Sequence, residues 1–293
     1  MSTATIGFIG GSGFYQMEGL IGAQELDVET PFGRTSDRIL VGEIESVPVA
    51  FMPRHGRNHN ISPTNIPTRA NIYAMKLLGV ERIVSISAVG SLRKDIRPMD
   101  FLVPDQLIDR TRNRTNTFFD EGIVAHIAFS NPFCQILSDL LSRVADREST
   151  THRGGTYVVM EGPQFSTRAE SALYRSWGAS VIGMTALPEA KLAREAELCY
   201  ATLALVTDYD TWHATEDEVS VEIVVENLVK NVTVSQKIIR ALIPEIPVVR
   251  DCICATALEN AIITSPVQVD EDTKRRLSVI VSRYLPVSHN SGM

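Results

Sequence analysis

The sequence predicts an α/β protein, a single-domain three-layer sandwich in which helices flank a mixed β-sheet. Two observations predict this class. Runs of strand-forming residues alternate with segments of helical spacing along most of the chain, which is typical of α/β folds. The 293 residues are 44% hydrophobic and 22% charged, an ordinary balance for a globular protein. A chain of this length can bury one large core.

The expected strands are short and bounded by turn residues. They are 5–10, a hairpin over 38–52, 82–90, 101–109 with an interruption at Pro104, 155–162, 180–184 and 200–208. The expected helices have apolar residues at helical spacing, and several end at Gly or Pro. They are 68–79, 131–147 with Asn131 and Pro132 at its start, 166–178, 187–199 and 219–243.

The chain shows no internal repeat and no clear domain boundary before about residue 244. We therefore predict one domain over 1–244. Residues 245–293 are expected to form a linker and a C-terminal helical extension, which packs on the same domain or on a neighbouring subunit. Within it, one helix is expected over 271–285.

Charge and hydropathy limit the classes of partner. The formal net charge of −7 gives no general attraction to nucleic acid or to an anionic membrane. The basic run "DRTRNRT" over 109–115 has no interleaved aromatic residues, and we interpret it as a solvated or ion-paired loop. The N-terminus has no signal-peptide pattern, and no window approaches the roughly 18 apolar residues of a membrane span. We expect a cytoplasmic protein with no nucleic-acid or membrane partner.

The four cysteines do not indicate a disulfide scaffold at this length. Cys134 and Cys199 lie in apolar settings and are expected to be small core residues. Cys252 and Cys254 form a Cys-x-Cys pattern that lacks the second pair that a zinc site needs. We expect no metal. The sequence does not decide whether Cys134 and Cys199, or Cys252 and Cys254, form a disulfide, although the cytosol disfavours disulfides.

Hydroxyl, cationic and glycine residues occur at the ends of four expected strands. The first strand leads into Gly-Gly-Ser-Gly around Ser12, and the hairpin leads into Arg54 and His55. Two later strands lead into Ser87 and Thr185. Each feature alone is explained by a turn or a helix cap. Because ligands of α/β sheets gather at the carboxyl ends of strands, the four together predict a site for a tetrahedral oxyanion such as phosphate.

A metal site is the alternative for His55 and His59, which are four residues apart. No Glu follows His55, and Gly56 disfavours a helix there, so the metalloprotease pattern is absent.

Two carboxylates follow the strand over 200–208, in "VTDYDTW". Acidic residues at strand ends are often solvated turn residues. Beside a phosphate site, however, Asp208 and Asp210 could protonate and orient a leaving base. Phe165, in "EGPQFSTRAE", is suited to stacking on a flat ring.

The chain resembles the nucleoside phosphorylase family of trimeric type over nearly its whole length. The resemblance is carried by "GFIGGSG", "TPFGRTSD", "PRHGRNH", "SAVGSLR", "PDQLIDRT", "EGPQFSTRAES", "GMTALPEAKLAREAELCYA" and "VTDYDTW". It implies the nucleoside phosphorylase fold, whose mixed sheet is partly barrel-like. It also implies a homotrimer, with a hexamer as the alternative, whose active sites are shared between subunits.

Residue by residue, the resemblance implies three groups around a nucleoside and a phosphate ion. The phosphate group is Ser12, Arg54, His55, Ser87, Ala88 and Thr185. The nucleoside group is Phe165, Met184, Asp208, Tyr209, Asp210, Val224, Val225 and a neighbouring subunit's copy of His126. The specificity group is Ser166 and Val221.

Two of these positions imply a 6-aminopurine. Family members that act on 6-oxopurines have Glu at the position of Ser166 and Asn at that of Asp208. A carboxylate accepts from a 6-amino group but repels a 6-oxo oxygen. Val221 suits a 5′-methylthio group better than a hydroxyl, since burying one methyl contributes roughly 0.8 kcal/mol. Gly183 departs from the animal members, which have Asn there.

The expected reaction is reversible phosphorolysis of 5′-methylthioadenosine to adenine and 5-methylthioribose 1-phosphate, with Asp208 as the general acid at N7. No metal or organic cofactor is expected, since phosphate is a co-substrate. The alternative is a broader enzyme that acts on adenosine or inosine. A nucleoside-binding regulator is a different class, but it would have no use for a second anion site.

Overall fold

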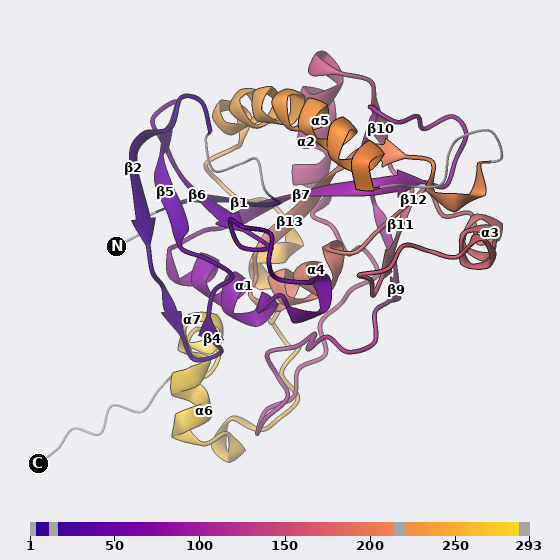
Figure 1. Ribbon diagram of the computed structural model, residues 1–293. Coiled ribbons are helices and arrows are strands. Elements are labelled where there is room, and N and C mark those ends of the chain that lie inside the picture. Colours follow the sequence, from indigo (N-terminus) through magenta and orange to yellow (C-terminus); the bar gives the residue numbers. More distant parts are fainter. Residues whose placement is uncertain (1–3, 12–16, 214–220, 287–293) are drawn as a thin grey trace, which may run out of the picture.

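The computed structural model describes residues 4–11, 17–213 and 221–286, without the side chains of Val221 and Ile223. Its centre is a mixed sheet of 11 strands with helices on both faces, as the sequence predicted (Figure 1). The strands are β1 (Ile6–Gly10), β2 (Ile21–Leu26), β5 (Ile39–Ile44), β6 (Val47–Pro53), β7 (Arg82–Ser91), β8 (Phe101–Val103), β9 (Gln106–Arg110), β10 (Thr151–Arg153), β11 (Thr156–Met160), β12 (Val181–Gly183) and β13 (Cys199–Asp208).

The main path of the sheet runs β10-β8-β13-β7-β1-β6-β5-β2. The neighbours β13, β7, β1 and β6 are parallel, and β5 and β2 continue the path antiparallel. A branch of β9, β11 and β12 joins through β12, which pairs antiparallel with the end of β7. Two further strands, β3 (Glu29–Thr30) and β4 (Gly33–Arg34), form a separate small hairpin.

Four helices cover the two faces. Helices α2 (Gln135–Glu148) and α5 (Val221–Leu242) share one core cluster with β1, β7 and β13, and they lie together above the sheet in Figure 1. Helices α1 (Thr68–Leu77) and α4 (Ala186–Glu195) share a second cluster on the opposite face. Another helix, α3 (Arg168–Ser176), lies beside the branch formed by β9, β11 and β12. All ten residues of β13 are buried, as expected for a central parallel strand covered on both faces.

The hairpin over 38–52 is confirmed, with Glu45 and Ser46 at positive φ in its two-residue turn. The interruption at Pro104 is also confirmed, because β8 ends at Val103 and β9 begins at Gln106. By contrast, β2, β3, β4 and β10 were not predicted. β2 is exposed at the sheet edge, so its sequence carries no apolar run.

Some predicted boundaries were wrong. The helix expected from Asn131 begins at Gln135, because the backbone N–H of Cys134 pairs with the carbonyl of Tyr200. The helix expected from Ser166 begins at Arg168. Its N-cap is Thr167, which forms a capping box with Glu170.

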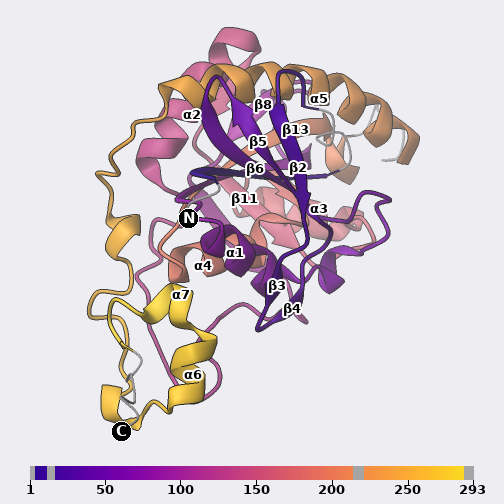
Figure 2. The ribbon, with the colours of Figure 1, turned by 90° about the vertical axis from the view of Figure 1, so that its left-hand side faces the viewer.

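The C-terminal segment contains two short helices where one was expected over 271–285. They are α6 (Glu271–Arg276) and α7 (Ser278–Val281), separated at Leu277, whose φ of −99° and ψ of 8° leave the helical range. They lie beside α1 in Figure 2, and the hydroxyl of Tyr73 on α1 donates to the carbonyl of Arg276 at 3.0 Å. The division into 1–244 and 245–293 stays a prediction. Across the described residues, no helix is both long and apolar enough to cross a membrane.

Candidate active site

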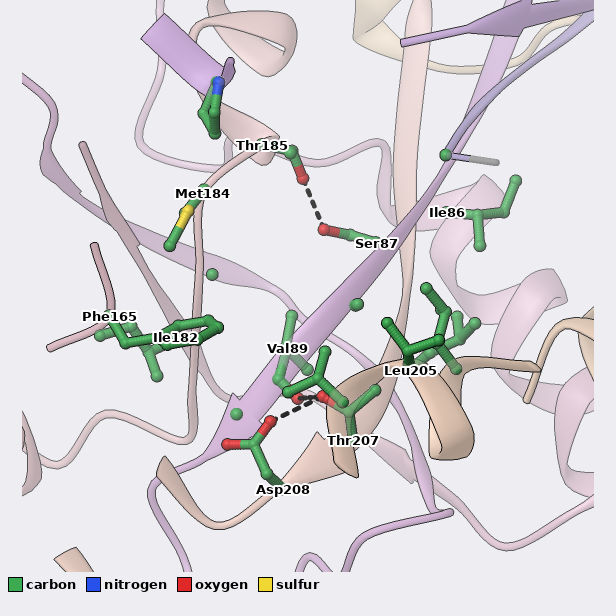
Figure 3. Close-up of a pocket in the computed structure, with 18 of the residues that line it drawn as sticks. Ile86, Ser87, Val89, Phe165, Ile182, Met184, Thr185, Leu205, Thr207 and Asp208 are labelled. Atoms are coloured by element: carbon green, nitrogen blue, oxygen red, sulfur yellow. Dashed lines mark hydrogen bonds between the residues drawn. The ribbon is translucent and has the colours of Figure 1, made fainter. Parts of the chain in front are cut away.

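A cavity of about 300 Å³ opens where the sequence predicted a site, around β7 and the carboxyl end of β13. Loops after β6, β11 and β12 and the first turns of α5 complete its wall (Figure 3). Many residues named from the sequence meet there. They are Arg54, His55, Ser87, Ala88, Phe165, Met184, Thr185, Asp208, Asp210, Val224 and Val225.

One end of the cavity carries hydroxyl groups. The Oγ atoms of Ser87 and Thr185 are 2.5 Å apart, and Ser87 also lies 3.1 Å from the hydroxyl of Tyr157 (Figure 3). Ser87 is not at a strand end as expected, because β7 continues to Ser91. A cluster of buried hydroxyls with rotatable protons can donate to an anion.

Arg54 lies behind these hydroxyls and is almost completely buried. Its guanidinium makes a bidentate ion pair with Glu189, with N···O distances of 2.5 and 3.2 Å. It also donates to the carbonyls of Ile9 and Ile86 and to Ser85. Although burial lowers the pKa of Arg54, the Glu189 carboxylate more than offsets this, so the pKa lies above its usual value.

Counted over the described residues, these contacts use four of the five N–H groups of Arg54, so one Nη1 hydrogen is left for an anion. Glu189 is therefore the group that fixes this cation at the cavity. The Glu189 carboxylate also accepts from Ser85 and Tyr200, both at its Oε2.

His55 presents one ring nitrogen as an acceptor. Its Nδ1 lies 2.8 Å from the carbonyl of Ile61, which can only accept, so the proton of the neutral ring is on Nδ1. Burial, and then the charge of Arg54, lower the pKa of His55 to about 4. At neutral pH, Nε2 of His55 is consequently a lone-pair acceptor.

Asp208 lies at the opposite end of the cavity from Thr185 (Figure 3). Its Oδ1 accepts from the backbone N–H of Asp210 at 2.8 Å, and its Oδ2 is 2.7 Å from the hydroxyl of Thr207. Thr207 is also 3.2 Å from the carbonyl of Val89. Thr207 has one proton for two acceptors. A protonated Asp208 would donate to Thr207, which would then donate to Val89, so the geometry accommodates a carboxylic acid at this position.

Asp210 lies beside Asp208 with an unusual backbone. Its φ is +51°, a left-handed conformation that is uncommon outside glycine. Ser166 donates to its Oδ1 at 2.5 Å, while its buried Oδ2 has no hydrogen-bond partner among the described residues. An unpaired buried carboxylate oxygen is costly and is suited to a donor group of a ligand. Ser166 does not line the cavity, and its hydroxyl holds the Asp210 carboxylate in place.

The walls between the two polar ends are apolar. Phe165 is 43% exposed, so its ring is available for stacking, and Met184 lies near it (Figure 3). From α5, Val224 and Val225 are joined by two residues that the sequence reading missed, Leu228 and Val232. They continue the helical spacing of the two valines, which is the signal that could have found them.

Two glycines permit close approaches at the cavity. A Cβ on Gly90 would lie 2.8 Å from Oδ1 of Asp208. A Cβ on Gly183 would lie 2.3 Å from the hydroxyl of Tyr157. A side chain such as Asn therefore cannot fit at the Gly183 position unless Tyr157 moves.

Among the described residues, Tyr209 and His126 do not line the cavity of the single chain, as Ser166 does not. Ser12 and the side chain of Val221 lie outside the described residues. Tyr209 packs against Trp212 and His213 and lies 3.3 Å from the carbonyl of Lys94. His126 is exposed in the segment that pairs with residues near Ala261.

The segment "DRTRNRT" is ion-paired, as one part of our interpretation had it, but Arg114 within it is not solvated. Its Nε lies 3.4 Å from Oε1 of Glu161, and only 3% of its side chain is exposed. Its guanidinium also donates to the carbonyls of Met184 and Leu187 and to those of Met160 and Glu161, at 2.6 to 3.3 Å. It thereby joins the two loops that carry Met184 and Phe165. This burial could not be predicted, since an arginine among polar residues is normally exposed.

Two asparagines of α5 hold the end of β13. Asn227 donates to the carbonyl of Thr207 at 2.7 Å, and Asn231 donates to that of Val206 at 3.0 Å. Their i, i+4 spacing on an otherwise apolar face was the available signal.

With this geometry in view, the chain was compared with known proteins. The model of the phosphorylase superfamily matches residues 5–244. An S-methyl-5′-thioadenosine phosphorylase from Geobacter sulfurreducens is 54% identical over 282 residues, which cover 96% of this chain and 99% of that protein.

Solved structures of methylthioadenosine phosphorylases are also similar to this chain. A methylthioadenosine phosphorylase from an antarctic soil metagenomic library has a TM-score of 0.91 at 47% identity, covering 96% of this chain and 99% of its own. Methylthioadenosine phosphorylase from Schistosoma mansoni in complex with adenine has a TM-score of 0.79 at 32% identity, covering 95% and 98%.

Proposed function

The chain belongs to the phosphorylase superfamily, and on that premise we propose that it catalyses the reversible phosphorolysis of 5′-methylthioadenosine. The products are adenine and 5-methylthioribose 1-phosphate, so the protein is a pentosyltransferase of nucleoside salvage. The observation that carries this function is one cavity with hydroxyl and cationic donors at one end and two carboxylates at the other. A broader purine nucleoside phosphorylase acting on adenosine or inosine is not favoured by the relatives.

Phosphate binds at the end formed by Arg54, His55, Ser87 and Thr185. Ser12 and the backbone of Ala88 complete this end in our proposal. Because Nε2 of His55 is an acceptor, it takes the O–H of hydrogenphosphate. The unprotonated oxygens then face the hydroxyls, the remaining Nη1 hydrogen of Arg54 and the sugar.

Adenine binds at the carboxylate end, between Phe165 and Asp208. The unpaired Oδ2 of Asp210 accepts from the 6-amino group, and Ser166 holds Asp210 in place. A 6-oxo group offers no donor to that oxygen, so 6-oxopurines bind poorly. Met184 lies against the ribose. The valines of α5, with Val221 as the specificity residue and Val224 and Val225 beside it, receive the methylthio group.

The reaction breaks the bond between C1′ and N9, and its electron pair leaves with the base. Asp208 donates a proton to N7, so adenine departs neutral. A phosphate oxygen forms the new bond to C1′ of the cationic sugar, and the phosphate gives up its proton to His55. His55 then loses that proton and Asp208 regains one, so both residues return to their starting states. The net reaction neither takes up nor releases a proton. In this scheme phosphate is a co-substrate, and neither a metal nor an organic cofactor takes part.

We further propose a cytoplasmic homotrimer with shared sites, a hexamer being the alternative. His126 then reaches the cavity of a neighbouring subunit and closes the methylthio end, together with Tyr209 from the chain's own site. Support comes from the exposure of His126, which is not among the residues that line its own cavity.

The test is phosphate-dependent release of free base from 5′-methylthioadenosine, adenosine and inosine under the same conditions. A large preference for 5′-methylthioadenosine is expected. Comparable rates on inosine would contradict the roles of Asp208 and Ser166. Release without phosphate would contradict phosphorolysis.

A further inference from the structure

The structure brings all four cysteines of the chain into one cluster. Cys134 precedes α2, Cys199 begins β13, and Cys252 and Cys254 lie in the segment after α5. Their four Sγ atoms lie within 4.8 Å of one another, with 3.3 Å between those of Cys199 and Cys252. The Cys-x-Cys pattern therefore has the second pair that the sequence did not show. That pair comes from two separate elements.

This arrangement has the dimensions of a thiolate metal site. Four sulfurs at about 2.3 Å from a common zinc ion lie about 3.8 Å apart at the tetrahedral angle. One sulfur pair lies at 3.3 Å and all four sulfurs lie within 4.8 Å of one another, so the cluster has the size of such a site. Ile253, between the two cysteines of the pattern, is 67% exposed, so it turns outward while both neighbours turn inward. We propose that Cys134, Cys199, Cys252 and Cys254 bind one Zn²⁺ ion as a closed structural site.

The surroundings suit such a site. Zinc with four thiolates carries a net charge of −2, which needs nearby cations when it is buried. Arg82 and Arg250 line the small cavity that Cys134, Cys199 and Cys252 also line. The charge of the buried Arg194 also acts on Cys254. Three arginines thus lie near the cluster.

Metal binding displaces the protons of the four thiols and releases them to the solvent, so zinc affinity should fall as the pH falls.

The site is structural because it is far from the reaction. Cys199 and Asp208 are the first and last residues of β13, which places them about 30 Å apart along an extended strand. The ion would join the segment after α5 to β13 and α2. Removing it should therefore loosen that segment.

The first measurement is the zinc content of the full-length protein without a histidine tag, purified under reducing conditions and dialysed. We expect about one zinc ion per chain, and four free thiols per chain once the ion is removed in denaturant without reductant. Replacement by Co²⁺ should give the thiolate charge-transfer absorption of a tetrahedral site. Chelation should lower the midpoint of thermal unfolding by about 5–10 °C.

The variant C252S/C254S should lose the zinc. Its matched control is Ser138→Ala, which removes a buried hydroxyl in the first turn of α2 next to Cys134 but no sulfur, and should keep the zinc.

Three results would overturn the proposal. One is a wild-type protein that holds no zinc as purified and takes up none from added Zn²⁺ when reduced. Another is the finding that the four cysteines form two disulfides. The third is full zinc content in C252S/C254S. Because metal content, thiol count and the cobalt spectrum are measured on the wild type, they decide the matter even where the double variant does not fold.

Discussion

The two ends of β13 differ in almost every physical respect, although the strand between them is uniformly buried. At its carboxyl end, Asp208 is held by a backbone N–H and a threonine hydroxyl beside an open cavity. At its amino end, Cys199 lies in a closed cluster of sulfurs beneath arginines. Beside the first end, the buried Oδ2 of Asp210 has no hydrogen-bond partner among the described residues, whereas at the second end four thiols are gathered together. A change at the carboxyl end should thus alter turnover, and one at the amino end should alter stability.

The largest expected effect is that of Asp208→Asn. The amide keeps the shape and the bond from the Asp210 N–H but cannot protonate N7. We expect kcat for 5′-methylthioadenosine to fall by about 10²- to 10⁴-fold, with little change in thermal unfolding. The control is Asp251→Asn, an exposed carboxylate beside the cysteines, which should leave kcat unchanged. Full turnover by Asp208→Asn would remove the acid role.

Glu189→Gln should alter both stability and phosphate binding, since it removes the charge that pairs with the buried Arg54. We expect a loss of about 3–5 kcal/mol in the free energy of unfolding. The KM for phosphate should rise much more than the KM for the nucleoside, because Glu189 acts by positioning Arg54. Steady-state kinetics and denaturant unfolding measure the two effects.

The control for Glu189 is on the same helix. Glu195→Gln also changes a buried carboxylate of α4, but Glu195 binds Thr117 and Phe118, away from the cavity. It should destabilise the protein without raising the KM for phosphate. An equal rise in both variants would assign the effect of Glu189 to general damage.

The acid sensitivity of folding should depend on His55. Its pKa is about 4 in the folded protein, against an ordinary 6.5. Between these values the unfolded chain binds more protons than the native one, so the free energy of unfolding falls as the pH falls, by about 3 kcal/mol in all. Denaturant unfolding of wild type and His55→Gln between pH 7 and 4 measures this, and the variant should show the smaller loss.

Glu195 contributes with the opposite sign. Burial raises its pKa to about 7 from an ordinary 4.5, so its contribution to stability falls as the pH rises between those values. The contributions of His55 and Glu195 to the pH dependence of stability partly cancel in the wild type. The informative quantity is therefore the difference in the free energy of unfolding between wild type and His55→Gln at each pH. Identical pH profiles would contradict a neutral His55.

The smallest expected effect is that of Arg114→Lys. A lysine keeps the charge but cannot reach four carbonyls with one ammonium group. We expect a loss of about 1–3 kcal/mol in stability and a fall in kcat/KM of about tenfold, as the loops that carry Met184 and Phe165 separate. Arg112→Lys, at an exposed neighbouring position, is the matched control. Equal behaviour of the two variants would remove the positioning role of Arg114.

Much of the carboxyl end could be predicted from the sequence, whereas the amino end could not. Parallel strands deliver their ends to one edge, so finding Arg54 and Asp208 at strand ends was enough to bring them together. Thr185 arrives differently, because β12 runs antiparallel to the end of β7 and returns toward Ser87. The structure confirmed the α/β sandwich for the same reason, since its strands and helices alternate visibly. Exposed β2 was missed because nothing apolar marks it.

The cysteine cluster depends on contacts between segments far apart in sequence, which spacing within one segment does not reveal. The burial of Arg114 was missed on the same ground, because apart from Glu161 its partners are backbone carbonyls, which no residue type signals. The roles of Ser166 and Asp210 needed the left-handed backbone of Asp210, which the sequence does not encode in any simple pattern.

The complete burial of β13 has a consequence for how the protein opens. Its amides are hydrogen-bonded within the sheet and covered by helices on both faces, so they should exchange with deuterium only when the whole domain unfolds. Asp208, the carboxylate that we assign to proton transfer, therefore belongs to the strand that should open last. Substrate binding should slow exchange in α5 and around Phe165 and leave β13 as it was.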